Sequence, residues 1–264
     1  MSASSPIGIL DSGFGGLSVA RAVRTALPGE ALLYAADCGF APWGDRTDAF
    51  INARLDQIVG FLLDRGAKAI VLACNTATAV AAKRLRETLS IPVIGIEPAV
   101  LPAAKVTRSG IVGVMATTKT LSSSKYQCLR ERLPDTVRII DRPCPGLMDR
   151  VEAGDFSSDV TRTLLHAYID PLISAGTDTL VLGCTHYPFL SKTITEIAGP
   201  NVTLIDPAPA VARQLPHRLA EANQLSNQKA GGTEAFYTTD AAPARARVLQ
   251  ALWNEHALLQ ELPR

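Results

Sequence analysis

The fold is decided by the stretch Ala69-Ile70-Val71-Leu72-Ala73-Cys74-Asn75-Thr76, in which an apolar, partly β-branched run ends in a cysteine. The same arrangement returns in Thr179-Leu180-Val181-Leu182-Gly183-Cys184-Thr185-His186. Short apolar runs of this kind predict buried strands, and open α/β sheets bind ligands at the carboxyl ends of their strands. A helix is predicted after each cysteine. We therefore expect the two thiols to act as a pair on one small molecule.

Around these two stretches, apolar runs alternate with amphipathic segments. We expect strands at residues 7–10, 31–36, 69–72, 92–96, 110–115, 137–140, 179–182 and 202–205. Helices are expected between and after them. They include 17–27, a helix capped by Thr47 that ends at Arg65, 78–89, a helix capped by Ser158 that runs to about Ser174, and 210–222. Such alternation with short connections predicts an α/β fold of two pseudo-symmetric lobes, with largely parallel sheets flanked by helices.

Features of the first half recur in the second half at offsets of about 105 to 110 residues, which suggests an internal duplication. For example, Ile96-Glu97-Pro98-Ala99 corresponds to Ile205-Asp206-Pro207-Ala208. We expect residues 1–97 and 208–264 to form the first lobe, because the tail, with a strand at 235–238 and a helix at 243–252, should return to it. Residues 98–207 form the second lobe, and the active site is expected in a cleft between the lobes.

Composition excludes several classes of protein. The 264 residues are 47% hydrophobic, and 26 Lys and Arg nearly balance 25 Asp and Glu, which disfavours disorder and electrostatic nucleic-acid binding. No run approaches the roughly 18 apolar residues of a membrane span. The short polar start offers no export signal, and the five cysteines are an odd number. We expect a cytoplasmic protein with reduced thiols.

The two cysteines have different neighbours. Cys74 is expected at a helix N-terminus, where unpaired backbone N–H groups and the helix dipole favour a thiolate. His186, two residues beyond Cys184, can lie near that thiol and shift its protonation, or bind a substrate carboxylate. A Cys–His pair also permits covalent acyl transfer, but that chemistry needs one thiol and leaves Cys74 unexplained.

A glycine turn, Asp11-Ser12-Gly13-Phe14-Gly15-Gly16, follows the first strand. It matches a dinucleotide-binding turn poorly, because the third glycine of that pattern would fall at Ser18. We expect Ser12 and the turn amides to hold a small carboxylate, and Asp11 to bind an ammonium group or orient a proton. Asp37 is expected to be structural and to hold the aromatic loop at residues 39–46.

No metal site is expected, because neither Cys74 nor Cys184 has a close-spaced cysteine partner. The remaining cysteines, Cys38, Cys128 and Cys144, are expected to be structural.

Five ordered motifs resemble those of glutamate racemases, in the aspartate/glutamate racemase family. They are Asp11-Ser12-Gly13-x-Gly15-Gly16-Leu17-Ser18-Val19, Pro42-Trp43-Gly44-x-Arg46, Cys74-Asn75-Thr76-Ala77, Ala116-Thr117-x-x-Thr120 and Leu182-Gly183-Cys184-Thr185-His186-Tyr187-Pro188. The likeness spans residues 7 to 206. It implies cofactor-free interconversion of L- and D-glutamate, with D-glutamate supplied for peptidoglycan synthesis and cell shape.

The resemblance also implies roles for individual residues. Cys74 would act on D-glutamate with help from Asp11, and Cys184 would act on L-glutamate with help from His186, which Glu152 supports. Substrate contacts carry over onto Asp11, Ser12, Gly44, Asn75, Thr76, Thr185 and His186, with Thr117 and Thr120 as further candidates. Family members are often dimeric, so a homodimer is a possible assembly.

Two positions depart from the family pattern. Trp43, which we also expect to bind substrate, stands in the substrate loop where tyrosine is usual, and Lys119 stands where glycine is frequent. Three alternatives stay open at this point. A racemase of a related acidic amino acid such as aspartate would differ in its pocket residues. A cofactor-free decarboxylase would need only one cysteine. A non-enzymatic two-lobed binding protein would need neither thiol.

Overall fold

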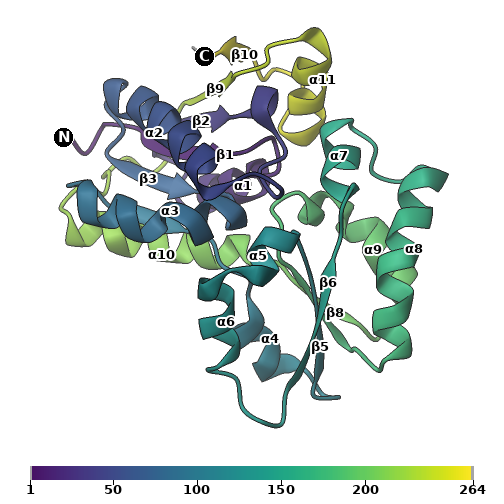
Figure 1. The fold of residues 1–264 in the computed structure, drawn as a ribbon. Coiled ribbons are helices and arrows are strands. Elements are labelled where there is room, and N and C mark those ends of the chain that lie inside the picture. Colours follow the sequence, from purple (N-terminus) through teal and green to yellow (C-terminus); the bar gives the residue numbers. More distant parts are fainter. Residues whose placement is uncertain (1, 263–264) are drawn as a thin grey trace. The chain divides into compact units, whose positions relative to one another are not determined.

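The computed structural model describes residues 2–262 and divides them into two compact units. The first unit contains residues up to Ile96 together with those from Ala208 onward, and the second runs from Glu97 to Pro207. Each unit is built around one parallel sheet with helices packed on it, so the predicted fold class is confirmed (Figure 1). Among the described residues, no helix combines the length and the apolarity that crossing a membrane requires.

The first unit holds a six-stranded sheet in the order β10-β9-β2-β1-β3-β4. Its strands are β1 (Ile7–Asp11), β2 (Leu32–Ala36), β3 (Ala69–Leu72), β4 (Val93–Gly95), β9 (Glu234–Thr238) and β10 (Leu259–Glu261). Its helices are α1 (Leu17–Ala26), α2 (Asp48–Asp64), α3 (Asn75–Thr88), α10 (Ala208–Glu221) and α11 (Pro243–Leu252), with a 3₁₀ turn at Cys38–Phe40. Helix α2 packs against α3, and α1 packs against α10.

The second unit holds a four-stranded sheet in the order β6-β5-β7-β8. Its strands are β5 (Ile111–Ala116), β6 (Arg138–Pro143), β7 (Thr179–Leu182) and β8 (Thr203–Ile205). Its helices are α4 (Val100–Val106), α5 (Thr118–Ser122), α6 (Ser124–Arg130), α7 (Leu147–Glu152), α8 (Asp159–Ser174) and α9 (Ser191–Ala198), with a 3₁₀ turn at Tyr187–Leu190. This strand order repeats the order β2-β1-β3-β4 of the first unit, as a duplicated sequence should.

Capping side chains fix several helix ends at the predicted positions. Thr47 accepts a hydrogen bond from the Phe50 amide at the start of α2, and Ser158 accepts one from the Thr161 amide at the start of α8. Gly66, just beyond α2, has the positive φ of 79° that a helix C-terminus commonly requires. Two helices begin earlier than predicted: α3 starts at Asn75 instead of Thr78, and α10 starts at Ala208 instead of Ala210.

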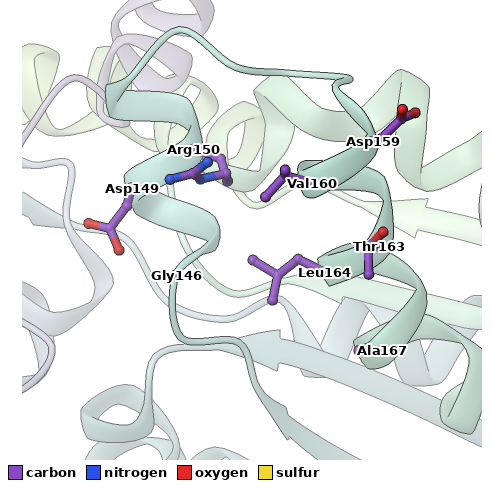
Figure 2. Close-up of a pocket in the computed structure, with 8 residues that line it drawn as sticks. All are labelled: Gly146, Asp149, Arg150, Asp159, Val160, Thr163, Leu164 and Ala167. Atoms are coloured by element: carbon purple, nitrogen blue, oxygen red, sulfur yellow. The ribbon is translucent and has the colours of Figure 1, made fainter.

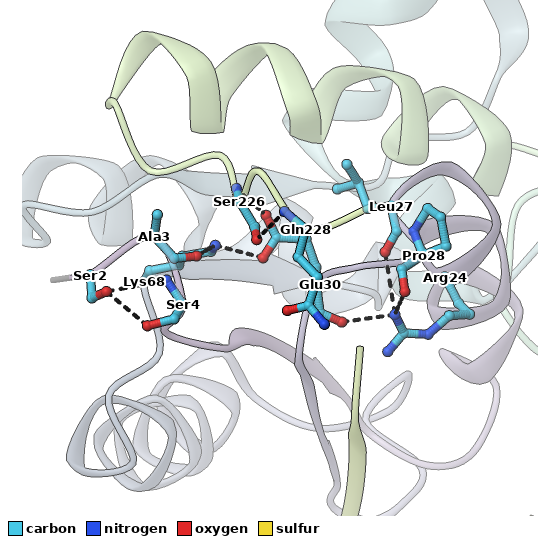
Figure 3. A network of polar contacts seen from close by, with 10 residues as sticks. All are labelled: Ser2, Ala3, Ser4, Arg24, Leu27, Pro28, Glu30, Lys68, Ser226 and Gln228. Carbon is cyan, nitrogen blue, oxygen red and sulfur yellow. Dashed lines mark hydrogen bonds and ion pairs between the residues drawn. The ribbon is translucent and has the colours of Figure 1, made fainter. Parts of the chain in front are cut away.

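A buried ion pair lies beside the amino ends of the central strands of the first unit (Figure 3). Lys68 Nζ lies 2.5 Å from Glu30 Oε2 and donates to the Ala3 carbonyl, while Glu30 Oε1 accepts from the Ser226 amide at 2.8 Å. Because both charges are removed from water, these partners are needed to offset the cost of burial. The network ties the amino-terminal segment and the loop after α10 to the sheet, at the end opposite the predicted site residues.

Candidate active site

The predicted site residues form two sets, one in each unit. In the first unit, Asp11 ends β1 and Cys74 lies two residues beyond β3, and these two strands are neighbours in the sheet. Ser12 Oγ lies 3.8 Å from Cys74 Sγ, within hydrogen-bonding range for sulfur. Both side chains are buried. The sheet order therefore brings the glycine turn and the first cysteine motif together, as their positions after strands predict.

Cys74 is itself the N-cap of α3. The backbone amide of Ala77 donates to Cys74 Sγ at 3.5 Å, so the sulfur takes the place of the usual capping oxygen. Unpaired amides and the helix dipole concentrate positive charge at a helix N-terminus. Negative charge on this sulfur is therefore stabilised by groups that carry no titratable proton of their own.

The turn after β1 is built around the Asp11 carboxylate, which accepts a hydrogen bond from the Gly16 amide at 2.7 Å. A Cβ atom at Gly16 would lie 2.7 Å from Asp11 Cβ and 2.9 Å from the Tyr34 hydroxyl, so only glycine fits there. The Tyr34 hydroxyl in turn donates to the Gly13 carbonyl at 2.7 Å. These contacts hold Asp11, which is fully buried, in a fixed position.

Asn75 and Thr76 follow Cys74 in the first turn of α3, and both side chains are buried. Within the described range 2–262, neither the oxygen nor the nitrogen of the Asn75 side-chain amide has a hydrogen-bond partner. A buried amide that stays unsatisfied costs about 1–3 kcal/mol, so it needs an explanation. A polar ligand beside Cys74 would supply one.

The aromatic loop of the first unit is anchored through Trp43. Its indole Nε1 donates to Asp37 Oδ2 at 3.2 Å, and its ring is buried. The expectation that Asp37 holds this loop is therefore confirmed. The next residue, Gly44, is only partly buried.

In the second unit, Cys184, His186 and Glu152 form a chain of contacts. Cys184 Sγ lies 3.6 Å from His186 Nδ1, and His186 Nε2 lies 2.8 Å from Glu152 Oε1. All three side chains are buried. Glu152 comes from α7, while the other two follow β7. This grouping brings together three of the predicted catalytic residues.

The surroundings of His186 favour its protonated form. Burial alone would lower the imidazole pKa, but the hydrogen bonds and negative charges of Cys184 and Glu152 outweigh burial and raise the pKa well above its ordinary value. An imidazole held between a thiol and a carboxylate can exchange a proton with the sulfur or stabilise negative charge on it. Cys184 therefore has an imidazole beside its sulfur, and Cys74 has a helix N-terminus beside its own.

Close packing places Cys184 at the end of β7. A Cβ atom at Gly183 would lie 2.8 Å from Ala116 Cβ on β5, so a larger residue would push these two strands apart. Thr185 is buried beside the cysteine. Thr117 directly follows β5, which pairs with β7, and is the N-cap of α5; its hydroxyl lies 2.9 Å from that of Thr120. The predicted residues of this unit thus gather at neighbouring strand ends.

Cys144, which the sequence predicts to be structural, is a neighbour of Cys184. It follows β6, and its amide donates to the Ala116 carbonyl at 3.1 Å. Burial, reinforced by the charge of nearby Cys184, raises the pKa of the Cys144 thiol far above its usual range. The Tyr187 hydroxyl donates to the Cys144 carbonyl at 3.3 Å. The one sequence signal for this proximity is that Cys144, like Cys74 and Cys184, follows a strand of a parallel sheet.

The second unit also contains a hollow of about 620 Å³ between α7 and α8 (Figure 2). It is lined by Gly146, Asp149, Arg150, Asp159, Val160, Thr163, Leu164 and Ala167. None of these is a predicted site residue, and the hollow holds neither cysteine. We therefore place the chemistry at the strand ends and not in this hollow.

Comparisons with known proteins agree with this geometry. The family model of Asp/Glu/hydantoin racemases matches residues 18–215. A glutamate racemase of Stutzerimonas stutzeri is 46% identical over 261 residues, covering 98% of each chain. The crystal structure of a glutamate racemase isoform from Bacillus anthracis superposes with a TM-score of 0.88 at 33% identity, covering 98% of this chain and 97% of that one.

A second solved structure adds a ligand. The glutamate racemase of Escherichia coli, crystallised with L-glutamate and the activator UDP-MurNAc-ala, superposes with a TM-score of 0.85. It is 31% identical, and the match covers 97% of this chain and 98% of that chain.

Proposed function

The chain belongs to the family of Asp/Glu/hydantoin racemases, and from this membership we propose that it interconverts L- and D-glutamate by proton transfer through Cys74 and Cys184. Racemisation removes the α-proton from one face of the carbon and returns a proton to the other face. Two acid–base groups of similar character, one for each face, meet that need. The proposal requires the two thiols to reach opposite faces of one α-carbon.

The observation that carries the proposal is that each unit supplies a buried cysteine with its own support for negative charge on sulfur. Cys74 has the Ala77 amide at 3.5 Å, and Cys184 has His186 at 3.6 Å. In our proposal Cys74 takes the proton from D-glutamate and Cys184 takes it from L-glutamate. Asp11 assists Cys74, and His186, held by Glu152, assists Cys184.

The substrate is held by polar groups around its charged ends. We assign this role to Asp11, Ser12, Gly44, Asn75, Thr76, Thr117, Thr120, Thr185 and His186. The unsatisfied amide of Asn75 supports the assignment most directly, because a substrate carboxylate or ammonium group beside Cys74 would complete its hydrogen bonding. Donors around the carboxylate would also stabilise the negative charge that develops when the α-proton leaves.

The choice of glutamate over aspartate rests on the relatives, which are named glutamate racemases and are 45% to 49% identical over nearly the whole chain. We further propose that the D-glutamate formed supplies peptidoglycan synthesis. No step of the proposed chemistry calls for a cofactor.

One experiment tests the reaction itself. The purified protein is incubated with L-glutamate in D₂O without added cofactor, and the α-proton signal and the optical rotation are followed. We expect deuterium to enter the α-position while rotation decays to zero, and the same end point from D-glutamate. Parallel incubations with L-aspartate decide the substrate. Retention of the α-proton in glutamate would sink the assignment.

A further inference from the structure

Trp43 has an unusual environment for a residue predicted to bind substrate. Its side chain is 1% exposed and belongs to the same apolar cluster as Ile51, Leu55 and Cys74. Its only polar group, the indole N–H, donates to Asp37 Oδ2 at 3.2 Å. The ring is therefore committed to the protein interior, and its polar atom is already used. Trp43 has nothing left with which to bind a polar substrate directly.

Asp37 is the centre of this anchor. Its carboxylate is fully buried, and each of its oxygens accepts two hydrogen bonds. Oδ2 accepts from Trp43 and from Arg54 Nε at 2.9 Å. Oδ1 accepts from Arg54 Nη2 at 2.7 Å and from the Thr239 hydroxyl at 3.0 Å. A carboxylate satisfied in this way is a rigid point of attachment. Moving any partner away would leave a buried negative charge without one of the hydrogen bonds that offset the cost of its burial.

The anchor joins segments that lie far apart in the sequence. Asp37 follows β2, Arg54 lies in α2, and Thr239 follows β9, the strand that pairs with β2. The Thr239 hydroxyl also accepts from the Gly39 amide at 3.0 Å, and the Arg54 guanidinium lies 3.7 Å from the centre of the Phe40 ring. The loop is therefore held on both sides of Ala41-Pro42, immediately before Gly44.

We propose that Asp37 and Trp43 are positioning residues that fix the Gly44 backbone N–H for the substrate carboxylate. The inference rests on the proposed function. In it, Trp43 affects substrate binding by holding the loop in place and not by a contact between its indole and the substrate. In this chain the hydrogen bond from Trp43 to Asp37 holds the substrate loop. The hydrogen bond from Thr239 to Asp37 attaches the carboxyl-terminal part of the chain to the same anchor.

The first test separates binding from chemistry. Trp43→Phe keeps an aromatic ring but removes the N–H, so the loop loses its tie to Asp37. We expect KM for both glutamate enantiomers to rise about tenfold while kcat changes less than about threefold, because the lost interaction acts on binding and not on proton transfer. Trp253→Phe makes the same chemical change at the other tryptophan and should leave KM within about twofold. An unchanged KM in Trp43→Phe would overturn the proposal.

A second pair of variants tests the anchor without touching the loop's aromatic core. Thr239→Val removes the hydroxyl that bonds Asp37 and Gly39 but keeps the shape of the side chain. We expect KM to rise about threefold to fivefold, and Thr239→Ser, which restores the hydroxyl, to return KM to the wild-type value. A purely structural role would lower thermal stability in Thr239→Val without moving KM, and that result would contradict the inference.

A direct measurement of the bond distinguishes its failure from failure of the proposed function. The chain has two tryptophans, so ¹⁵N-labelled Trp253→Phe protein gives a single indole signal, that of Trp43. We expect this N–H to exchange slowly with D₂O, and to exchange much faster in Asp37→Asn. Fast exchange in the parent protein would refute the anchor. If the anchor is protected but wild-type protein fails to exchange the α-proton of glutamate, the proposed function falls and the substrate role of the anchor falls with it.

Discussion

The surroundings of Cys74 and Cys184 differ although their places in the fold are the same. Each thiol is buried and lies two residues beyond a fully buried central strand, β3 in one unit and β7 in the other. After Cys74 the chain enters α3 at once, and an amide at its N-terminus bonds the sulfur. After Cys184 the chain makes a 3₁₀ turn at Tyr187–Leu190, and the sulfur contacts His186 instead.

This difference shows that negative charge on a thiol sulfur can be stabilised by two kinds of group, a backbone amide and an imidazole. A backbone amide keeps its hydrogen and its partial charge at every pH, so this part of the support of Cys74 does not titrate. An imidazole gains and loses a proton, so the support of Cys184 depends on pH. The two repeated halves therefore share a sheet topology but differ in the group that contacts the sulfur.

The largest effect is expected when either thiol is removed. Cys74→Ala and Cys184→Ala should each lower kcat for racemisation by at least about a thousandfold, because each removes one of the two acid–base groups that the proposed mechanism uses in a single turnover. The measurement is the decay of optical rotation starting from L-glutamate and from D-glutamate. The loss should be equally severe for both variants despite the different support of the two sulfurs.

The matched control is Cys128→Ala, because Cys128 is an exposed cysteine in α6 with no place in the proposed mechanism. Its activity should stay at the wild-type level. Wild-type turnover in Cys74→Ala or in Cys184→Ala would refute the pairing and leave a mechanism with one thiol.

Much of this contrast was accessible from the sequence. The apolar runs before Cys74 and Cys184 predicted buried strands, and their repetition predicted two similar sheets, both of which are confirmed. Thr47 and Ser158 marked helix starts because a hydroxyl side chain can satisfy an exposed amide there. These features depend on local chemistry that a single stretch of sequence carries.

Features that depend on tertiary packing were missed. Helix α3 was predicted to begin at about Thr78, but it begins at Asn75, directly after Cys74, which caps it. Strand β10 has three residues and forms only by pairing with β9 at the sheet edge. Cys144 follows β6 and Cys184 follows β7. Their proximity depends on the sheet order, in which β5 alone lies between these two strands.

A smaller effect with a distinct pH signature is expected for Glu152→Gln. The wild-type His186 pKa is raised, so the protonated imidazole stabilises the fold below its ordinary value of about 6.5, and this contribution is lost as pH rises through the raised pKa. Glutamine keeps the shape but removes the charge, so His186 should lose its proton at lower pH. We expect kcat/KM to fall about tenfold on the alkaline side and less near pH 6.

The measurements are a pH–rate profile and an NMR titration of the four histidines, of which His186 is buried. Asp170→Asn is the matched control, because it removes the carboxylate from an exposed pair. In that pair, Asp170 Oδ2 lies 3.1 Å from His166 Nδ1. That variant should leave the profile unchanged. An alkaline limb that does not move in Glu152→Gln would show that His186 does not govern the support of Cys184.

The smallest effect is expected at Cys144, and it sharpens the comparison by asking whether a third thiol shares the work of Cys184. Burial and the charge of Cys184 raise the Cys144 pKa, which disfavours the thiolate that would have to accept the α-proton. Its Sγ lies 3.2 Å from the Arg142 carbonyl, to which it donates. Cys144→Ala should therefore keep kcat in both directions within about threefold, with a modest loss of stability from the smaller side chain. Racemisation and thermal unfolding measured on the same sample separate the two effects. A hundredfold loss of kcat in a folded variant would make Cys144 part of the proton-transfer group, and the contrast between the two units would then have to include a second thiol beside Cys184.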